Sequence, residues 1–121
     1  MVNDLNYIQI GQIARAFGIF DCIPCARAIK AFLVERGIAG THIKLDTGSQ
    51  DPIFGRIYDD SIGELIATTG HPEGIEVLVD GQKLVFDNVH TQGIDRSDWI
   101  QNLYSPLLET GETFRITEIE F

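Results

Sequence analysis

The chain has 121 residues, 44% of them hydrophobic, which is enough apolar surface for one core and predicts a single domain over residues 1–121. Its 18 acidic and 9 basic side chains give a formal net charge of −9, which disfavours binding to nucleic acid. The apolar runs are too short to cross a membrane, and residues 1–6 do not resemble the start of a signal peptide. We therefore expect a cytoplasmic chain, or a part of a larger exported protein.

Two helices are expected in the first third of the chain. Residues 5–17 place apolar side chains near helical spacing and end at a glycine. A second helix is expected to begin at Cys22, because Asp21 is a good N-cap residue and Pro24 is tolerated only in a first turn. An apolar face follows, and Gly37 is a typical end of a helix.

Short strands and a loop are expected after the second helix. Ile43 and Leu45 alternate with polar neighbours, which favours a strand. Residues 47–52 are rich in turn formers and predict a loop, whereas residues 54–58 favour another strand. Residues 61–69 fit a short helix and a strand equally well.

The last third of the chain has the clearest β pattern. Residues 74–79 and 82–87 are predicted to form a hairpin around an Asp-Gly turn. A short helix is expected over residues 97–103. Residues 113–121 predict a final strand, whose alternation changes at residues 117–118 and indicates either a bulge or a change of the buried face there. Helices followed by strands indicate an α+β fold with a mainly antiparallel sheet.

The turn of the hairpin decides which side chains share a face of the sheet. A three-residue loop over residues 79–81 would place His71 and Asp87 on the same face. A two-residue turn shifts the parity by one, and Asp87 then shares a face with Pro72. In that register His71 lies opposite His90. The sequence permits both turns.

The two cysteines, Cys22 and Cys25, are expected in the first turn of the second helix. Two cysteines alone cannot form a structural zinc site, and a disulfide between them would close a loop too small to add much stability. A helix N-terminus and a nearby imidazolium favour the nucleophilic thiolate. The pair therefore indicates thiol chemistry without a metal or an organic cofactor. The histidine candidates are His42, His71 and His90; His71 lies just before the hairpin, whereas His42 and His90 are expected to be exposed loop residues.

Several segments carry a family resemblance: residues 20–28, 74–79, 85–88 and 93–94, together with Trp99. They resemble the papain fold toxin 2 family, the effector domains of bacterial polymorphic toxin systems. The resemblance implies a papain-like α+β fold and a cysteine hydrolase, either a protease or a glutamine deamidase, that acts on a protein or peptide. It implies Cys22 as the nucleophile, Cys25 as the alternative, His71 as the base and Asp87 as the orienter of His71. An immunity-type protein is the implied partner.

Two other functions are compatible with the sequence. The Cys22-x-x-Cys25 motif at a helix start resembles that of thioredoxin and glutaredoxin, although that fold needs a buried strand before the motif. If the histidine of the family belongs one place later, Pro72 occupies its position. The domain would then be an inactive papain-like binding module. The sequence does not indicate an oligomeric state.

Overall fold

The structure is a computed structural model that describes residues 2–48, 51 and 53–121. Two helices open the chain, α1 (Asp4–Arg15) and α2 (Cys22–Glu35), and both lie close to the predicted positions. The side chain of Asn3 caps α1 by accepting a hydrogen bond from a backbone N–H of the first turn. The second helix ends before Gly37, whose φ of 68° lies in the left-handed region that favours glycine.

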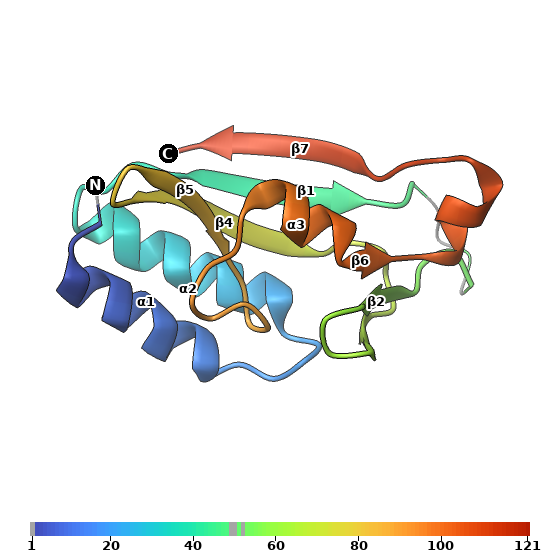
Figure 1. The fold of residues 1–121 in the computed structure, drawn as a ribbon, viewed down its shortest axis with the longest axis horizontal. Coiled ribbons are helices and arrows are strands. Elements are labelled where there is room, and N and C mark those ends of the chain that lie inside the picture. Colours follow the sequence, from blue (N-terminus) through green and yellow to red (C-terminus); the bar gives the residue numbers. More distant parts are fainter. Residues whose placement is uncertain (1, 49–50, 52) are drawn as a thin grey trace.

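A four-stranded antiparallel sheet has the strand order β5-β4-β1-β7. Its strands are β1 (Thr41–Asp46), β4 (Glu73–Val79), β5 (Gln82–Phe86) and β7 (Arg115–Glu120). Figure 1 shows α2 along one face of this sheet, with α1 beside it. Helices followed by antiparallel strands confirm the predicted α+β fold.

A smaller antiparallel sheet has the strand order β3-β2-β6. Its strands are β2 (Ile57–Asp59), β3 (Glu64–Ala67) and β6 (Leu103–Tyr104). The chain therefore forms a strand within residues 61–69, where the sequence fitted a helix equally well. The predicted loop over residues 47–52 lies partly outside the described residues, because residues 49, 50 and 52 are not described.

A short helix, α3 (Arg96–Gln101), connects the hairpin to β6. Asp95 caps this helix, since its carboxylate accepts a hydrogen bond from a backbone N–H of the first turn. The helix is shorter than predicted because Leu103 pairs with β2 as part of a strand. A 3₁₀-helix, η1 (Pro106–Thr110), then leads towards β7.

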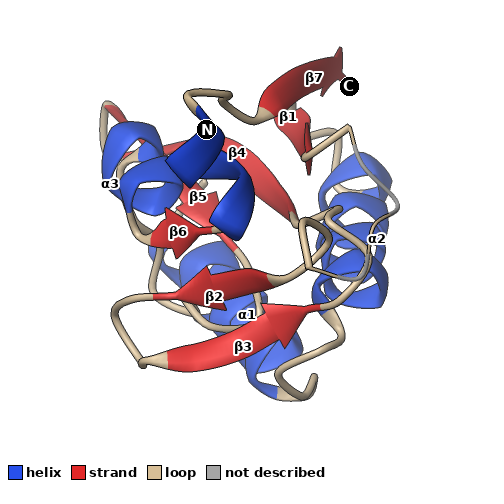
Figure 2. Cartoon of the chain, turned by 90° about the vertical axis from the view of Figure 1, so that its right-hand side faces the viewer, coloured by secondary structure: helices blue, strands red, loops and turns tan. Residues whose placement is uncertain are grey.

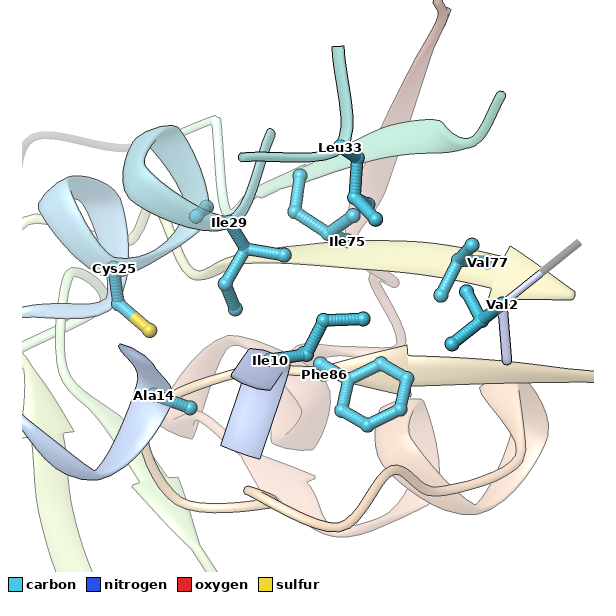
Figure 3. Packing of buried hydrophobic residues seen from close by; sticks show 10 residues of the cluster. Val2, Ile10, Ala14, Cys25, Ile29, Leu33, Ile75, Val77 and Phe86 are labelled. Atoms are coloured by element: carbon cyan, nitrogen blue, oxygen red, sulfur yellow. The ribbon is translucent and has the colours of Figure 1, made fainter. Parts of the chain in front are cut away.

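The large sheet has a hydrophobic cluster on each face, and Figure 2 shows α2 and α3 on opposite sides of β4 and β5. Members of the first cluster, between the sheet and α1 and α2, include Ile10, Ile29, Ile75 and Phe86 (Figure 3). Members of the second cluster, on the α3 side, include Ile43, Val85 and Trp99. Neighbouring residues of β5 therefore enter different clusters, as expected for side chains that alternate along a strand.

The strand β7 lies at the edge of the large sheet. It pairs with β1 in an unbroken register from Asp46 opposite Arg115 to Thr41 opposite Glu120. All 6 residues of the strand are exposed, so neither face of it needs a consistent row of apolar side chains. Of the two alternatives for residues 117–118, the unbroken register excludes the bulge. The change of alternation there reflects the exposure of both faces.

The packing of the sheet against α3 leaves no room for a side chain at Gly74. A Cβ atom there would lie 2.7 Å from Cγ1 of Val85 and 3.0 Å from Cζ2 of Trp99. We expect Gly74→Ala to lower the free energy of unfolding by about 1–3 kcal/mol, because overpacking forces buried neighbours apart. Urea unfolding followed by tryptophan fluorescence measures this loss. Gly18→Ala is the control, since its Cβ meets only Asp21, at 3.4 Å. Equal stability of the two variants would contradict the packing.

Candidate functional site

The first turn of α2 has no side-chain cap at its N-terminal end. Cys22 is the first residue of the helix, and Asp21 is in the N-cap position. The sequence predicts that Asp21 caps the helix, but its side chain makes no capping hydrogen bond. Its carboxylate instead accepts a hydrogen bond from the backbone N–H of Gly18 at 3.1 Å. Helix N–H groups without a side-chain cap are the groups that bind anionic oxygen atoms at other helix termini.

The loop that leads into α2 is held by Asn88, which follows β5. The side-chain amide of Asn88 donates hydrogen bonds to the carbonyl oxygens of Gly18 at 2.5 Å and Ile19 at 2.9 Å. The side chains of Ile19 and Phe20 are exposed. Asn88 therefore fixes the segment in front of Cys22 to the end of the hairpin.

Cys25 is a residue of the hydrophobic core. It is fully buried in the cluster between the helices and the sheet, and its sulfur points towards Ala14 in Figure 3. Burial is the main reason that the pKa of Cys25 rises to about 12, and the negative charge of Asp87 adds to the effect. A thiol that is so enclosed and so strongly protonated is poorly suited to attack a substrate.

Cys22 lies against the segment that leads into β4. It is 5% exposed, and its Sγ donates a hydrogen bond to the carbonyl oxygen of His71 at 3.9 Å. Burial raises the pKa of Cys22, and the carboxylates of Asp87 and Glu73 raise it further. The backbone N–H groups of Glu73 and Ile23 lower the pKa, but they do not cancel the effect of burial. The resting form of Cys22 is therefore the neutral thiol.

The hairpin of β4 and β5 closes through the two-residue turn, one of the two alternatives that the sequence permits. The turn residues, Asp80 and Gly81, have φ angles of 49° and 79°, both left-handed. In this register Asp87 shares a face with Pro72, and His71 lies on the other face. The three-residue loop, which would place His71 and Asp87 side by side, is not formed.

Asp87 is buried on the side of the sheet that α3 covers. Its Oδ2 accepts a hydrogen bond from Nε1 of Trp99 at 2.8 Å. Its Oδ1 accepts hydrogen bonds from the backbone N–H groups of Val89 at 3.0 Å and His90 at 2.6 Å. Both oxygens therefore hold α3 and the turn after β5. The role of Asp87 as the orienter of His71 stays a prediction from the family resemblance.

His71 lies in the segment before β4, and its ring is about half exposed. The ring Nδ1 lies 3.6 Å from the carboxylate Oδ1 of Asp46, the last residue of β1. The carbonyl oxygen of His71 accepts the hydrogen bond from Cys22. The structure therefore brings His71 to Cys22 through its backbone and to Asp46 through its ring.

The other two histidines are more buried than the sequence suggests: the expectation of exposed loop residues is wrong for His42, and His90 lies in a loop but is not exposed. His42 lies in β1 and is 4% exposed, and its Nε2 lies 2.6 Å from Oε1 of Glu73. Nε2 of His90 lies 3.0 Å from Oδ2 of Asp59, which is fully buried. Each of these rings is held by a buried carboxylate from a distant part of the sequence.

No pattern in the sequence singles out Asp46 or Asn88 as a functional residue. The only sequence signal for Asp46 is its position at the end of an alternating strand. Its contact with His71 depends on the pairing of β1 with β4, which local patterns do not encode. Asn88 belongs to a segment that carries the family resemblance, but its partners in the loop before Cys22, Gly18 and Ile19, lie 70 and 69 residues away in the sequence.

Among residues 2–48, 51 and 53–121, no three His, Cys, Asp or Glu side chains are grouped so that they could hold a metal ion. In the same part of the chain, no helix has the length and apolar character needed to span a membrane.

Comparison with known proteins identifies the family of this scaffold. The family model described as Papain fold toxin 2 matches residues 6–104, which contain Cys22, His71 and Asp87. No curated protein and no solved structure gives a significant match. Because the matched segment covers most of the 121 residues, the chain belongs to the papain fold toxin 2 family.

Proposed function

We propose that this domain is a toxin effector that hydrolyses amide bonds of a protein target, with Cys22 as the nucleophile and His71 as the base. The position of Cys22 is the observation that carries the proposal. It is the first residue of α2, whose N-terminus has no side-chain cap, and its sulfur contacts the segment that carries His71. Membership of the papain fold toxin 2 family supports the same class of chemistry.

In the first step, the sulfur of Cys22 attacks the carbonyl carbon of the amide, and the thiol proton passes to Nε2 of His71. Because burial raises the pKa of Cys22, the proton leaves during the attack rather than before it. The substrate oxygen becomes negatively charged in the tetrahedral intermediate. The first N–H groups of α2, such as that of Ile23, are the donors that would bind this oxygen.

In the second step, the bond between carbon and nitrogen breaks, and His71 returns the proton to the leaving nitrogen. A thioester between Cys22 and the acyl group remains. Water then attacks the thioester carbonyl with His71 as the base, and the thiol is restored. Loss of ammonia from a glutamine side chain makes the reaction a deamidation, and cleavage of a peptide bond makes it proteolysis.

The partners that fit this proposal are proteins. A protein or peptide is the substrate, and an immunity-type protein blocks the site, in keeping with the toxin family. The net charge of −9 favours a basic surface on either partner. Delivery as a part of a larger exported toxin completes the proposal.

An inactive papain-like binding module is the second candidate. Two observations favour it: the raised pKa of Cys22, and the position of Pro72 on the face that Asp87 shares. A histidine in place of this proline would have faced Asp87. The thiol–disulfide function has less support, because the helix α1 precedes the Cys22-x-x-Cys25 motif where that fold needs a buried strand.

The two thiols should differ in their reaction with iodoacetamide. Because burial raises both pKa values, that of Cys25 to about 12, we expect Cys25 to stay unmodified at neutral pH while Cys22 reacts slowly. A higher pH increases the thiolate fraction, so both rates should rise as the pH approaches 12. Mass spectrometry after timed alkylation measures them, with the urea-unfolded chain, whose thiols have pKa values of about 8.5, as the reference. Equal rates for Cys25 in the folded and unfolded chains would contradict its place in the core.

Expression of the domain in a bacterial host tests the proposed function. We expect the wild type to stop growth, and Cys22→Ala and His71→Ala to weaken this effect about 100-fold or more, because each removes a group needed for the attack. Cys25→Ala is the matched control and should still stop growth. Viable counts measure the effect, and circular dichroism confirms that each variant folds.

Two results of this experiment would overturn the hydrolase. Growth arrest by Cys22→Ala as strong as that by the wild type would show that the thiol is not needed, as expected of a binding module. Loss of the effect in both Cys22→Ala and Cys25→Ala, with His71→Ala unaffected, would instead indicate thiol–disulfide exchange.

A further inference from the structure

We propose that Asp46 is the residue that positions His71 for catalysis, a role that rests on the proposed hydrolase function. The carboxylate of Asp46 holds the proton on Nδ1 of His71, which leaves the lone pair of Nε2 free to accept the proton of Cys22. Oδ1 of Asp46 and Nδ1 of His71 lie 3.6 Å apart, slightly more than the length of a hydrogen bond. Such contacts between catalytic groups are often long before a substrate is bound.

The register of β1 and β4 places the two side chains opposite each other. Lys44 pairs with Glu73 in the antiparallel ladder. Two residues further on, the same register brings Asp46 opposite His71. The contact therefore follows from the pairing of the strands.

Two backbone hydrogen bonds continue the ladder on either side of this pair. The N–H of Leu45 donates to the carbonyl of Pro72 at 2.9 Å, and the N–H of Thr47 donates to the carbonyl of Gly70 at 3.1 Å. The pair between them is therefore a non-hydrogen-bonded pair, in which opposite side chains lie closest, with Cβ atoms about 4.5–5.5 Å apart.

Both side chains lie on the face of the sheet that α2 covers. His71, Glu73 and Ile75 follow one another on this face because side chains alternate along a strand. Ile75 is in the cluster beneath α2, and the backbone of Glu73 lowers the pKa of the Cys22 thiol, whose sulfur donates to the carbonyl oxygen of His71. The thiol, the imidazole and the Asp46 carboxylate therefore belong to the same end of the same face.

The turn after β1 fixes the carboxylate of Asp46. The oxygen that faces His71, Oδ1, also accepts a hydrogen bond from the backbone N–H of Gly48 at 2.6 Å. Gly48 has a φ of 72°, and the guanidinium of Arg115 packs over it. Arg115 is the partner of Asp46 on β7, and Lys44 lies on the same face.

Asp87 is on the other face, where it holds Trp99 and the turn after β5. Its negative charge reaches Cys22, where it raises the pKa of the thiol. That effect opposes formation of a thiolate. The chain order of the three groups does not decide between the carboxylates, because the same catalytic geometry occurs with its members in different orders.

Nitrogen NMR of the His71 ring tests the proposal without a substrate. Long-range proton–nitrogen spectra of the labelled domain show which ring nitrogen carries the proton when the ring is neutral. We expect the proton mainly on Nδ1 in the wild type and mainly on Nε2 in Asp46→Ala. Asp87→Asn should leave the proton on Nδ1, and Asp60→Ala, at an exposed carboxylate in the turn after β2, is the control.

Alkylation of Cys22 is the second measurement on the same variants. We expect Asp46→Ala to slow the reaction with iodoacetamide at neutral pH roughly 2–5-fold, as the loss of an exposed ion pair allows. His71→Ala should slow it at least as much. Asp60→Ala should match the wild type.

The outcomes separate the proposal from the function on which it rests. The role of Asp46 is overturned if the tautomer of His71 is the same in Asp46→Ala as in the wild type, whether or not it changes in Asp87→Asn. If the tautomer responds to Asp46→Ala but His71→Ala does not slow the alkylation of Cys22, the hydrolase function fails while the contact stands. The positioning role is established if Asp46→Ala changes both the tautomer of His71 and the alkylation rate of Cys22, and the other two aspartate variants change neither.

Discussion

The antiparallel pairing between the end of β1 and the segment before β4 is the constraint on which the site depends. Two backbone hydrogen bonds set residues 45 and 47 against residues 72 and 70. This pairing turns the ring of His71 towards Asp46, on the face that α2 covers. The first turn of α2 meets the same segment through the sulfur of Cys22. A slip of one residue would move the imidazole to the opposite face of the sheet.

Burial and the helix N-terminus act on Cys22 in opposite directions. The unpaired N–H groups of a helix start favour a thiolate, whereas removal from water favours the thiol. Burial is the larger effect here, because the pKa of Cys22 is raised. The thiol is therefore not activated by its position alone. Its reactivity depends on a base, which makes the orientation of the His71 ring the decisive feature of the proposed mechanism.

Local patterns predict the elements that carry their own start and end signals. The first turn of α2 follows from Pro24 and its end from Gly37, which also places the cysteines correctly. Contacts between distant segments are not predictable in this way. Asp46 and His71 meet only because β1 pairs with β4, although β2 and β3 lie between these two strands in the sequence. The hairpin turn that places His71 and Asp87 on different faces was one of two turns that the sequence allows. The change of alternation along β7 could not by itself decide between a bulge and a change of the buried face, and the pairing with β1 excludes the bulge.

A crystal structure of the domain with a peptide aldehyde bound covalently to Cys22 tests the central claim most directly, because the adduct mimics the tetrahedral intermediate. We expect Nε2 of His71 within about 2.6–3.2 Å of the adduct oxygen. Nδ1 should still face Asp46, and the first N–H groups of α2 should bind the adduct oxygen. An adduct on Cys25, or an adduct on Cys22 with the ring of His71 turned away from it, would contradict the claim.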